Sequence, residues 1–113
     1  MVNLGPTGQV TFTFRCNTSR QVYLVGDFNS WDRMATPMMP GEDGMWYSTL
    51  KIGPGRHEFR YFEDGDIWHT DFAAFGVVRN EFGGFNSIVE VLPPVRLRAV
   101  PASYVFSQAH RQG

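Results

Sequence analysis

Residues 22–32 read VYLVGDFNSWD, an alternating apolar segment that stops in a polar turn holding a tryptophan. Val22 and Leu24 alternate with their neighbours at the period of two that is typical of a half-buried strand. Gly26 ends the run, and the turn formers that follow it are Asp27, Asn29 and Ser30. Trp31 therefore stands in a loop-like setting. Its ring either folds back into the core or is offered to a ligand as a stacking platform.

Short strands separated by turn signals recur about every ten residues along the chain. The strands that we expect cover residues 9–16, 22–25, 45–52, 56–62, 67–70 and 86–92. Two prolines interrupt residues 34–40, which predicts an edge strand or an extended loop there. Residues 72–85 are spaced by glycines and predict an irregular connection with room for one short strand. No stretch has helical periodicity, so the pattern predicts an all-β, antiparallel β-sandwich.

The length of 113 residues predicts a single domain. The amino-acid composition changes near the C-terminal end. We expect residues 1–8 to be a loose N-terminal lead-in and residues 9–92 to form the sandwich. Residues 93–113 hold three arginines and no acid, a net charge of +3, whereas the preceding body carries −4. This basic tail is expected to be partly disordered or to form a short docked helix.

Charge and targeting signals limit the classes of partner. The net charge is −1 and no Lys/Arg-rich run is present, which argues against nucleic acid and anionic membranes as partners. Cys16 is the single cysteine, so no internal disulfide can form. The first residues lack the pattern of a signal peptide, and no apolar run reaches transmembrane length. We therefore expect a cytoplasmic location.

Catalytic and metal-binding patterns are absent from the sequence. The acids at 63, 64 and 66 crowd one turn and are read as solvated turn residues. The three histidines, His57, His69 and His110, lack metal-ligand spacing, and His57 is expected to be a hydrogen-bonded core group. No nucleophile elbow or phosphate-cradling loop is present. The sequence therefore predicts no catalytic residue, metal or cofactor, and a protein that is not an enzyme.

The three tryptophans are the remaining chemical signal. Trp46 alternates with Leu50 and Ile52 and is expected in the core. Trp31 and Trp68 each lie beside a turn rich in acids or amides, a pairing that suits sugars. The C–H face of a pyranose stacks on an aromatic ring while polar side chains bond its hydroxyls. The polar candidates are Arg60, on an exposed strand face, and Asn86, which opens the last strand.

Three segments carry a family resemblance in addition to Trp68. They are VYLVGDFNSW at 22–31, GPGRHEFRYFEDG at 53–65 and GGFNSIVEV at 83–91. In these segments, the chain resembles the starch- and glycogen-binding module of the AMP-activated protein kinase beta subunit and of the N-terminus of isoamylases, pullulanases and branching enzymes. The resemblance extends over about residues 9–92. It implies an immunoglobulin-like sandwich of the early set type that binds α-1,4-glucan, such as glycogen, starch or maltooligosaccharide, without hydrolysing it.

The resemblance also implies roles for individual residues. Trp31 and Trp68 match the two stacking rings, and Arg60 matches a basic residue that contacts sugar hydroxyls. Asn86 matches a hydrogen-bonding asparagine, and Phe82 matches an apolar residue that inserts beside the glucan. Three features depart from the family pattern: a 64–68 hairpin one residue longer than usual, Phe72 in place of a proline, and Gly84 in place of a hydroxyl residue.

Two other functions stay open at this stage. One is a scaffolding module that docks a kinase or a glucan-acting enzyme, for which the basic tail is the motivation. The other is a non-catalytic fragment of a larger amylase-type enzyme. We expect glucan binding ahead of both because polar groups beside exposed rings suit a binding site.

Overall fold

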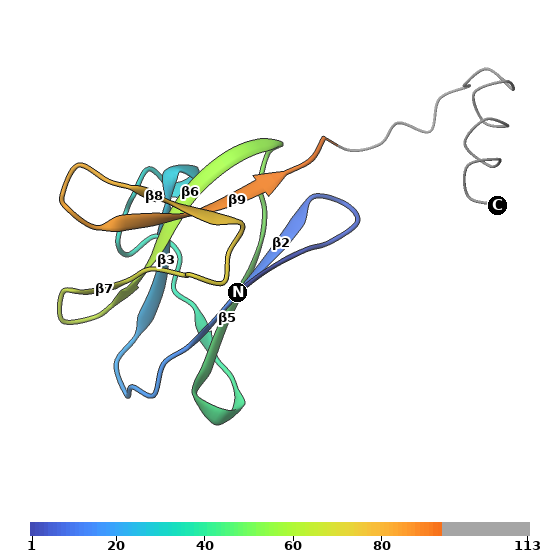
Figure 1. Ribbon diagram of the computed structural model, residues 1–113. Coiled ribbons are helices and arrows are strands. Elements are labelled where there is room, and N and C mark those ends of the chain that lie inside the picture. Colours follow the sequence, from blue (N-terminus) through green and yellow to red (C-terminus); the bar gives the residue numbers. More distant parts are fainter. Residues whose placement is uncertain (94–113) are drawn as a thin grey trace, which may run out of the picture.

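The structure, a computed structural model, describes residues 1–93, and these form a sandwich of two antiparallel sheets (Figure 1). The first sheet has the order β1 (Val2–Leu4), β2 (Gln9–Arg15), β5 (Met45–Lys51) and β4 (Met39–Pro40). The second has the order β3 (Val22–Gly26), β6 (Gly55–Glu63), β9 (Phe85–Val91) and β8 (Gly76–Arg79), and β7 (Ile67–His69) also pairs with β6. Two short 3-10 turns, η1 (Asp27–Asn29) and η2 (Glu42–Gly44), complete the fold. The all-β, early set prediction is confirmed.

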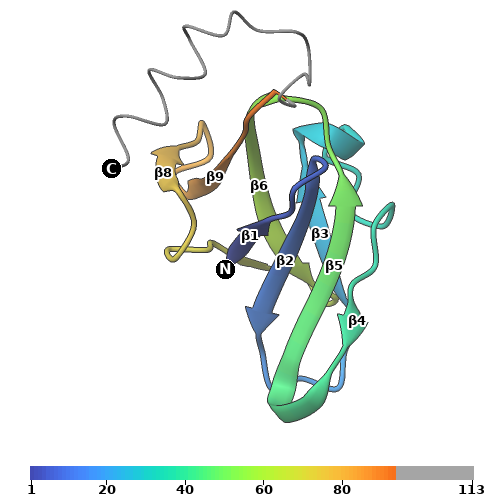
Figure 2. The same ribbon diagram turned by 90° about the vertical axis from the view of Figure 1, so that its right-hand side faces the viewer.

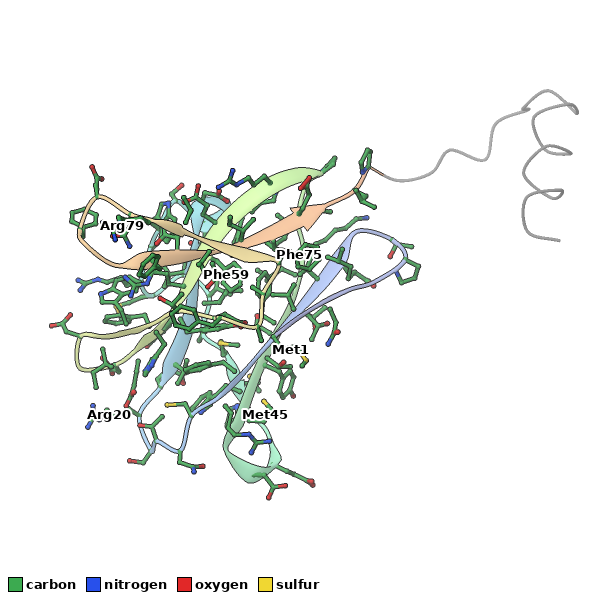
Figure 3. All side chains as sticks on the ribbon, in the orientation of Figure 1. Met1, Arg20, Met45, Phe59, Phe75 and Arg79 are labelled. Atoms are coloured by element: carbon green, nitrogen blue, oxygen red, sulfur yellow. The ribbon has the colours of Figure 1, made fainter. Side chains whose placement is uncertain are left out.

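The core lies where the two sheets face each other (Figure 2). Phe12 on β2 and Phe59 on β6 are fully buried, and their rings meet edge to face with centroids 4.9 Å apart. Figure 3 shows Phe59 inside the sandwich among side chains of both sheets. Trp46 is buried as predicted, and its indole nitrogen donates to the carbonyl of Cys16 at 3.1 Å. The inward faces therefore follow the alternation of the sequence.

The structure corrects the sequence prediction in one segment and defines it more closely in two others. Residues 2–4, expected within a loose lead-in, form strand β1 because they pair in register with residues 10–12 of β2. The segment 34–40, predicted as an edge strand or an extended loop, is mostly loop and ends in the two-residue edge strand β4, preceded by one bridge between Tyr23 and Pro37. The predicted short strand within 72–85 is present as β8. The tail from residue 94 on lies outside the described residues.

His57 is hydrogen-bonded as expected, but it lies at the rim of the sandwich and is not a core group. Its Nδ1 is 2.9 Å from Asp27 Oδ1, and its Nε2 is 2.8 Å from the carbonyl oxygen of Gly53. Both partners are acceptors, so only a protonated ring can donate to both. Burial lowers the pKa of His57, but the bonds to Gly53 and Asp27 and the Asp27 charge outweigh it and raise the pKa above its ordinary value.

The helical elements of residues 1–93 are the short 3-10 turns η1 and η2. No helix there is both long enough and apolar enough to cross a bilayer.

Candidate functional site

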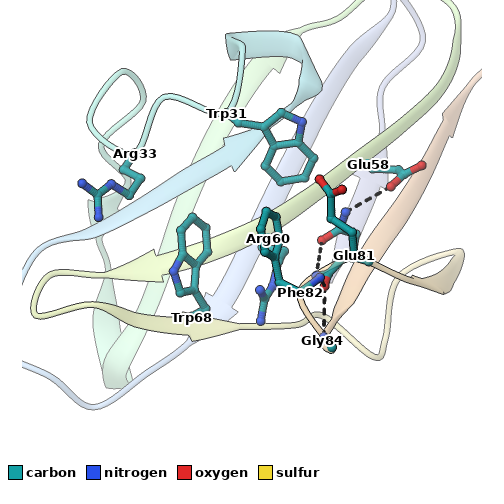
Figure 4. Close-up of a pocket in the computed structure, with 11 residues that line it drawn as sticks. Trp31, Arg33, Glu58, Arg60, Trp68, Glu81, Phe82 and Gly84 are labelled. Carbon is teal, nitrogen blue, oxygen red and sulfur yellow. Dashed lines mark hydrogen bonds between the residues drawn. The ribbon is translucent and has the colours of Figure 1, made fainter.

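A groove of about 930 Å³ lies on the outer face of the second sheet (Figure 4). Side chains from β6, β7 and β9 and from the loops after η1 and β8 surround it. Its lining residues are Trp31, Arg33, Glu58, Arg60, Trp68, Asn80, Glu81, Phe82, Gly83, Gly84 and Asn86. The structure therefore brings together all five residues that the sequence analysis selected. Trp31 and Trp68 are 38% and 36% exposed, so both rings are accessible to a ligand.

The turn after β3 positions Trp31. Asn29 accepts a hydrogen bond from the backbone of Gly26 at 3.0 Å and donates to the carbonyl of Leu24 at 2.9 Å and the hydroxyl of Thr36 at 3.0 Å. The amide of Trp31 donates to the carbonyl of Gly26 at 2.8 Å. These bonds close the η1 turn and satisfy its backbone groups. The turn thus directs the indole ring away from the core.

Two further residues of the same turn fix it against β6. Asp27 Oδ2 accepts the backbone N–H of Glu58 at 2.9 Å, so the turn is tied to a strand that lines the groove. Gly26 has no side chain, and a Cβ there would lie 2.5 Å from the Phe28 ring and 2.7 Å from the carbonyl oxygen of Glu58. The close approach of turn and strand therefore requires glycine at position 26.

Trp68 reaches the groove from β7 despite the longer hairpin. Residues 64–66 make the turn, and both Gly65 (φ +106°) and Asp66 (φ +65°) adopt left-handed conformations in it. Trp68 pairs directly with Phe62 of β6, and the two rings pack with centroids 4.8 Å apart. The added residue is absorbed in the turn, so the strand register still presents Trp68 to the groove.

Arg60 lies between the aromatic walls of the groove. Its guanidinium carbon is 5.3 Å from the centre of the Trp68 ring, within the range of a cation–π contact. Its Nε is buried and lacks a hydrogen-bond partner among residues 1–93. Burial lowers the pKa of Arg60, but arginine stays charged in proteins. The side chain therefore offers N–H donors at the base of the groove.

Asn86 belongs to a polar network along one side of the groove. Its Nδ2 donates to Glu58 Oε1 at 3.1 Å, and its Oδ1 accepts from Asn80 Nδ2 at 3.1 Å. Asn80 Oδ1 in turn accepts the backbone N–H groups of Phe82 and Gly84 at 2.9 and 3.0 Å. This shapes the 80–84 loop, at which Phe82 is 86% exposed beside the groove.

Several lining residues were not selected from the sequence. Glu58 shares the outward face of β6 with Arg60, so the alternation could have revealed it. Arg33, Asn80 and Glu81 lie on loops, where no periodic signal exists. Arg33 lies at the far end of the groove. Its Nη1 is 3.1 Å from Asp66 Oδ1, and its guanidinium carbon is 5.4 Å from the centre of the Phe62 ring. No histidine or cysteine is among the residues that line the groove.

The chain matches one protein family and is similar in sequence to several known proteins. The family described as the glycogen recognition site of AMP-activated protein kinase matches residues 9–97. The chain is 29% identical over 75 residues to SNF1 protein kinase subunit beta-3 of Saccharomyces cerevisiae and 30% identical over 76 residues to subunit beta-2 of the same yeast. It is also 36% identical over 53 residues to a 1,4-alpha-glucan-branching enzyme of Emericella nidulans.

These matches cover different shares of the two chains. The yeast alignments include 66% of this chain and the branching-enzyme alignment 47%. In the relatives, the matched part is 18% of either kinase subunit and 8% of the branching enzyme. The similarity is therefore confined to a small part of each relative.

Proposed function

This chain belongs to the family of the glycogen recognition site of AMP-activated protein kinase, and on that basis we propose that it binds α-1,4-glucan in the groove of the second sheet. Trp31 and Trp68 stack on the sugar rings, and Arg60 and Asn86 bond to the hydroxyls. Phe82 contacts the glucan from the 80–84 loop. One observation carries the proposal. A single groove is lined by two accessible indole rings, the polar side chains of Arg60 and Asn86, and the apolar ring of Phe82.

The chemistry of the groove suits a neutral polyhydroxyl ligand. Its aromatic walls offer flat faces to pyranose C–H groups. Its floor offers Arg60 donors, and its side offers both donors and acceptors from Asn80 and Asn86. A cation beside carboxylates makes the lining mixed in charge, which favours hydroxyl groups over a strongly charged ligand.

We propose binding without hydrolysis. A glycosidase needs one protonated carboxylic acid and a second carboxylate on opposite sides of the bond that breaks. Glu58 Oε1 accepts a hydrogen bond from Asn86, and its Oε2 forms an ion pair with Arg56 Nη2 at 3.9 Å, so neighbouring side chains engage this carboxylate. Glu81 is the other carboxylate of the groove and sits on an exposed loop. A test for new reducing ends after incubation with maltoheptaose checks this part of the proposal.

Calorimetric titration with maltoheptaose tests the binding itself. Replacing Trp31→Ala removes one stacking face, and a central aromatic anchor is worth about 2 kcal/mol, near a 30-fold loss of affinity. Tyr47→Ala is the matched control, because Tyr47 is 44% exposed but lies on β5 of the opposite sheet. Absence of binding at millimolar sugar, or equal losses in both variants, would contradict the proposal.

A second candidate function is docking to a kinase or a glucan-acting enzyme. The basic segment 93–113, which carries a net charge of +3, motivates it. Two relatives are named as protein kinase subunits. A binding assay with a purified kinase or glucan-acting enzyme, using the full chain and a chain ended at residue 92, tests this role. The cytoplasmic location expected from the sequence stays a prediction.

A further inference from the structure

A second cluster of chemically active side chains lies away from the groove. Cys16 Sγ, a carboxylate oxygen of Glu63 and a ring nitrogen of His69 all lie within 4.8 Å of one another. Cys16 follows β2 of the first sheet, Glu63 ends β6 and His69 ends β7 of the second sheet. We propose that these three side chains form a Zn²⁺ site that connects the two sheets.

Two of the three separations between the ligand atoms are close to those of a tetrahedral zinc centre. Cys16 Sγ is 3.6 Å from Glu63 Oε1, and His69 Nε2 is 3.1 Å from the same oxygen. Zinc bonds of about 2.3 Å to sulfur and about 2.0–2.2 Å to nitrogen and oxygen place tetrahedral ligand atoms about 3.3–3.6 Å apart. The two separations from Glu63 Oε1 are close to these values, and the separation between Cys16 and His69, within 4.8 Å, must shorten by about 1.2 Å at most for the three atoms to bind one ion.

The surrounding residues hold Glu63 in the required orientation. The Thr18 hydroxyl donates to Glu63 Oε2 at 2.9 Å, and Arg20 Nη1 lies 3.5 Å from the same oxygen. These contacts occupy Oε2 and leave Oε1 facing Cys16 and His69. Partners of this kind orient ligands in known metal sites. The guanidinium opposes a second cation electrostatically, but it lies on the far oxygen of the carboxylate.

Backbone hydrogen bonds and a ring contact also hold the other two ligands, Cys16 and His69, in place. The amide of Cys16 donates to the carbonyl of Gly44 at 2.8 Å, and its own carbonyl accepts from Trp46. The His69 ring packs on Phe14 with centroids 4.9 Å apart. The site thus stands on two strands and a short constrained segment, which favours defined geometry.

Metal binding changes the state of the thiol. In the structure, the Cys16 thiol donates a hydrogen bond to Glu63 Oε1, and burial, followed by the Glu63 charge, raises the pKa of the thiol. On binding, the S–H bond of Cys16 and the Nε2–H bond of His69 break, the two protons pass to solvent, and Zn–S and Zn–N bonds form. The His69 ring takes up a proton from solvent at Nδ1 to stay neutral, and no oxidation state changes. Three protein ligands leave the fourth position for water. Because the ion links both sheets in the folded state, it also raises the free energy of unfolding.

Titration of the chelator-treated full chain with Zn²⁺ and Co²⁺ tests the site. We expect one Zn²⁺ per chain, a rise in Tm with zinc concentration, and a thiolate-to-cobalt charge-transfer band in the near ultraviolet with Co²⁺. Cys16→Ser and His69→Gln each remove a ligand and should weaken zinc binding about tenfold or more, since loss of even a supporting partner costs about 10–100-fold. The matched control is His57→Gln, which also loses a histidine bonded to a carboxylate.

The outcomes separate cleanly. Wild-type affinity in His57→Gln together with weak binding in the two ligand variants supports the site. Wild-type affinity in Cys16→Ser, or Co²⁺ binding to the unaltered protein without a thiolate band, overturns it. The cobalt spectrum uses the unaltered chain, so it decides the matter even if a variant fails to fold. None of these readouts depends on glucan.

Discussion

At the scale of single residues, the turn after β3 holds its tryptophan in an unfavourable backbone conformation. Ser30 and Trp31 both have left-handed φ angles, +58° and +57°, which costs about 1–2 kcal/mol for each residue that is not glycine. The three side-chain bonds of Asn29 and the tie from Asp27 to β6 offset that cost. The residues of the GDFNSW motif thus hold the indole ring of Trp31 at a fixed position.

Gly26 is the position in this turn where an added side chain fits least well. Gly26→Ala would force its methyl group against the Glu58 carbonyl and the Phe28 ring, so we expect a loss of about 2–3 kcal/mol in the free energy of unfolding, typical of overpacking. Urea unfolding monitored by tryptophan fluorescence measures it. Gly53→Ala is the control, since nothing lies within 4 Å of its added Cβ. Equal stability of the two variants would show that the contact at Gly26 is not restrictive.

At the scale of elements, β6 contributes side chains both to the core and to the groove. It pairs with β3, β7 and β9. Its inward residues Phe59 and Tyr61 fill the core, while outward Glu58 and Arg60 line the groove. The period-two alternation of the sequence predicted these opposite faces correctly, because a strand has no other way to distribute neighbouring side chains.

His57 joins β6 to η1 and to the 53–55 turn, and this makes stability depend on pH. Its pKa is raised in the folded state, so protonation stabilises the fold fully below the ordinary pKa of about 6.5. That contribution is lost as the pH rises through the folded-state pKa. We expect the free energy of unfolding to fall more steeply over this range in the unaltered protein than in His57→Gln. Parallel pH curves for both proteins would refute this link.

Other features of the elements could not be read from the sequence. Val2-Asn3-Leu4 is too short to show a pattern, and it becomes a strand only because β2 offers it a free edge. The Cys16, Glu63 and His69 cluster joins residues separated by 47 and 6 positions, one in the segment after β2 and the others on β6 and β7, so no local spacing reveals it. His57 continues the inward alternation of its strand, but β6 has reached the rim of the sandwich there.

At the scale of the whole molecule, the contact between Phe12 and Phe59 holds the two sheets together. Phe59→Ala should cost about 3–5 kcal/mol, a large part of the about 5–15 kcal/mol that stabilises a typical domain. Thermal unfolding is the measurement. Phe72→Ala, at a side chain that is 74% exposed, should leave Tm nearly unchanged. A comparable fall of Tm in both variants would mean that the core is not centred on Phe59.

The groove was predictable in its residues but not in its shape. The rings and polar groups could be selected from motif positions and from the outward alternation of β6. That Trp31, Trp68 and Phe82 surround one opening depends on three loops and on how the 64–66 turn absorbs its added residue. Such loop geometry is set by individual side-chain hydrogen bonds within the loops, like those of Asn29 and Asn80, which leave no periodic signal in the sequence.

Glucan binding in the groove requires that the two exposed tryptophans, and not the buried one, meet the sugar. The indole N–H signals of Trp31, Trp46 and Trp68 in a nuclear magnetic resonance titration with maltoheptaose report on this directly, once each is assigned with a Trp→Phe variant. We predict saturable shifts for Trp31 and Trp68 and a fixed signal for Trp46, whose N–H is bonded to Cys16 within the sandwich. Unchanged signals for Trp31 and Trp68 at saturating sugar, or a shift confined to Trp46, would contradict the account.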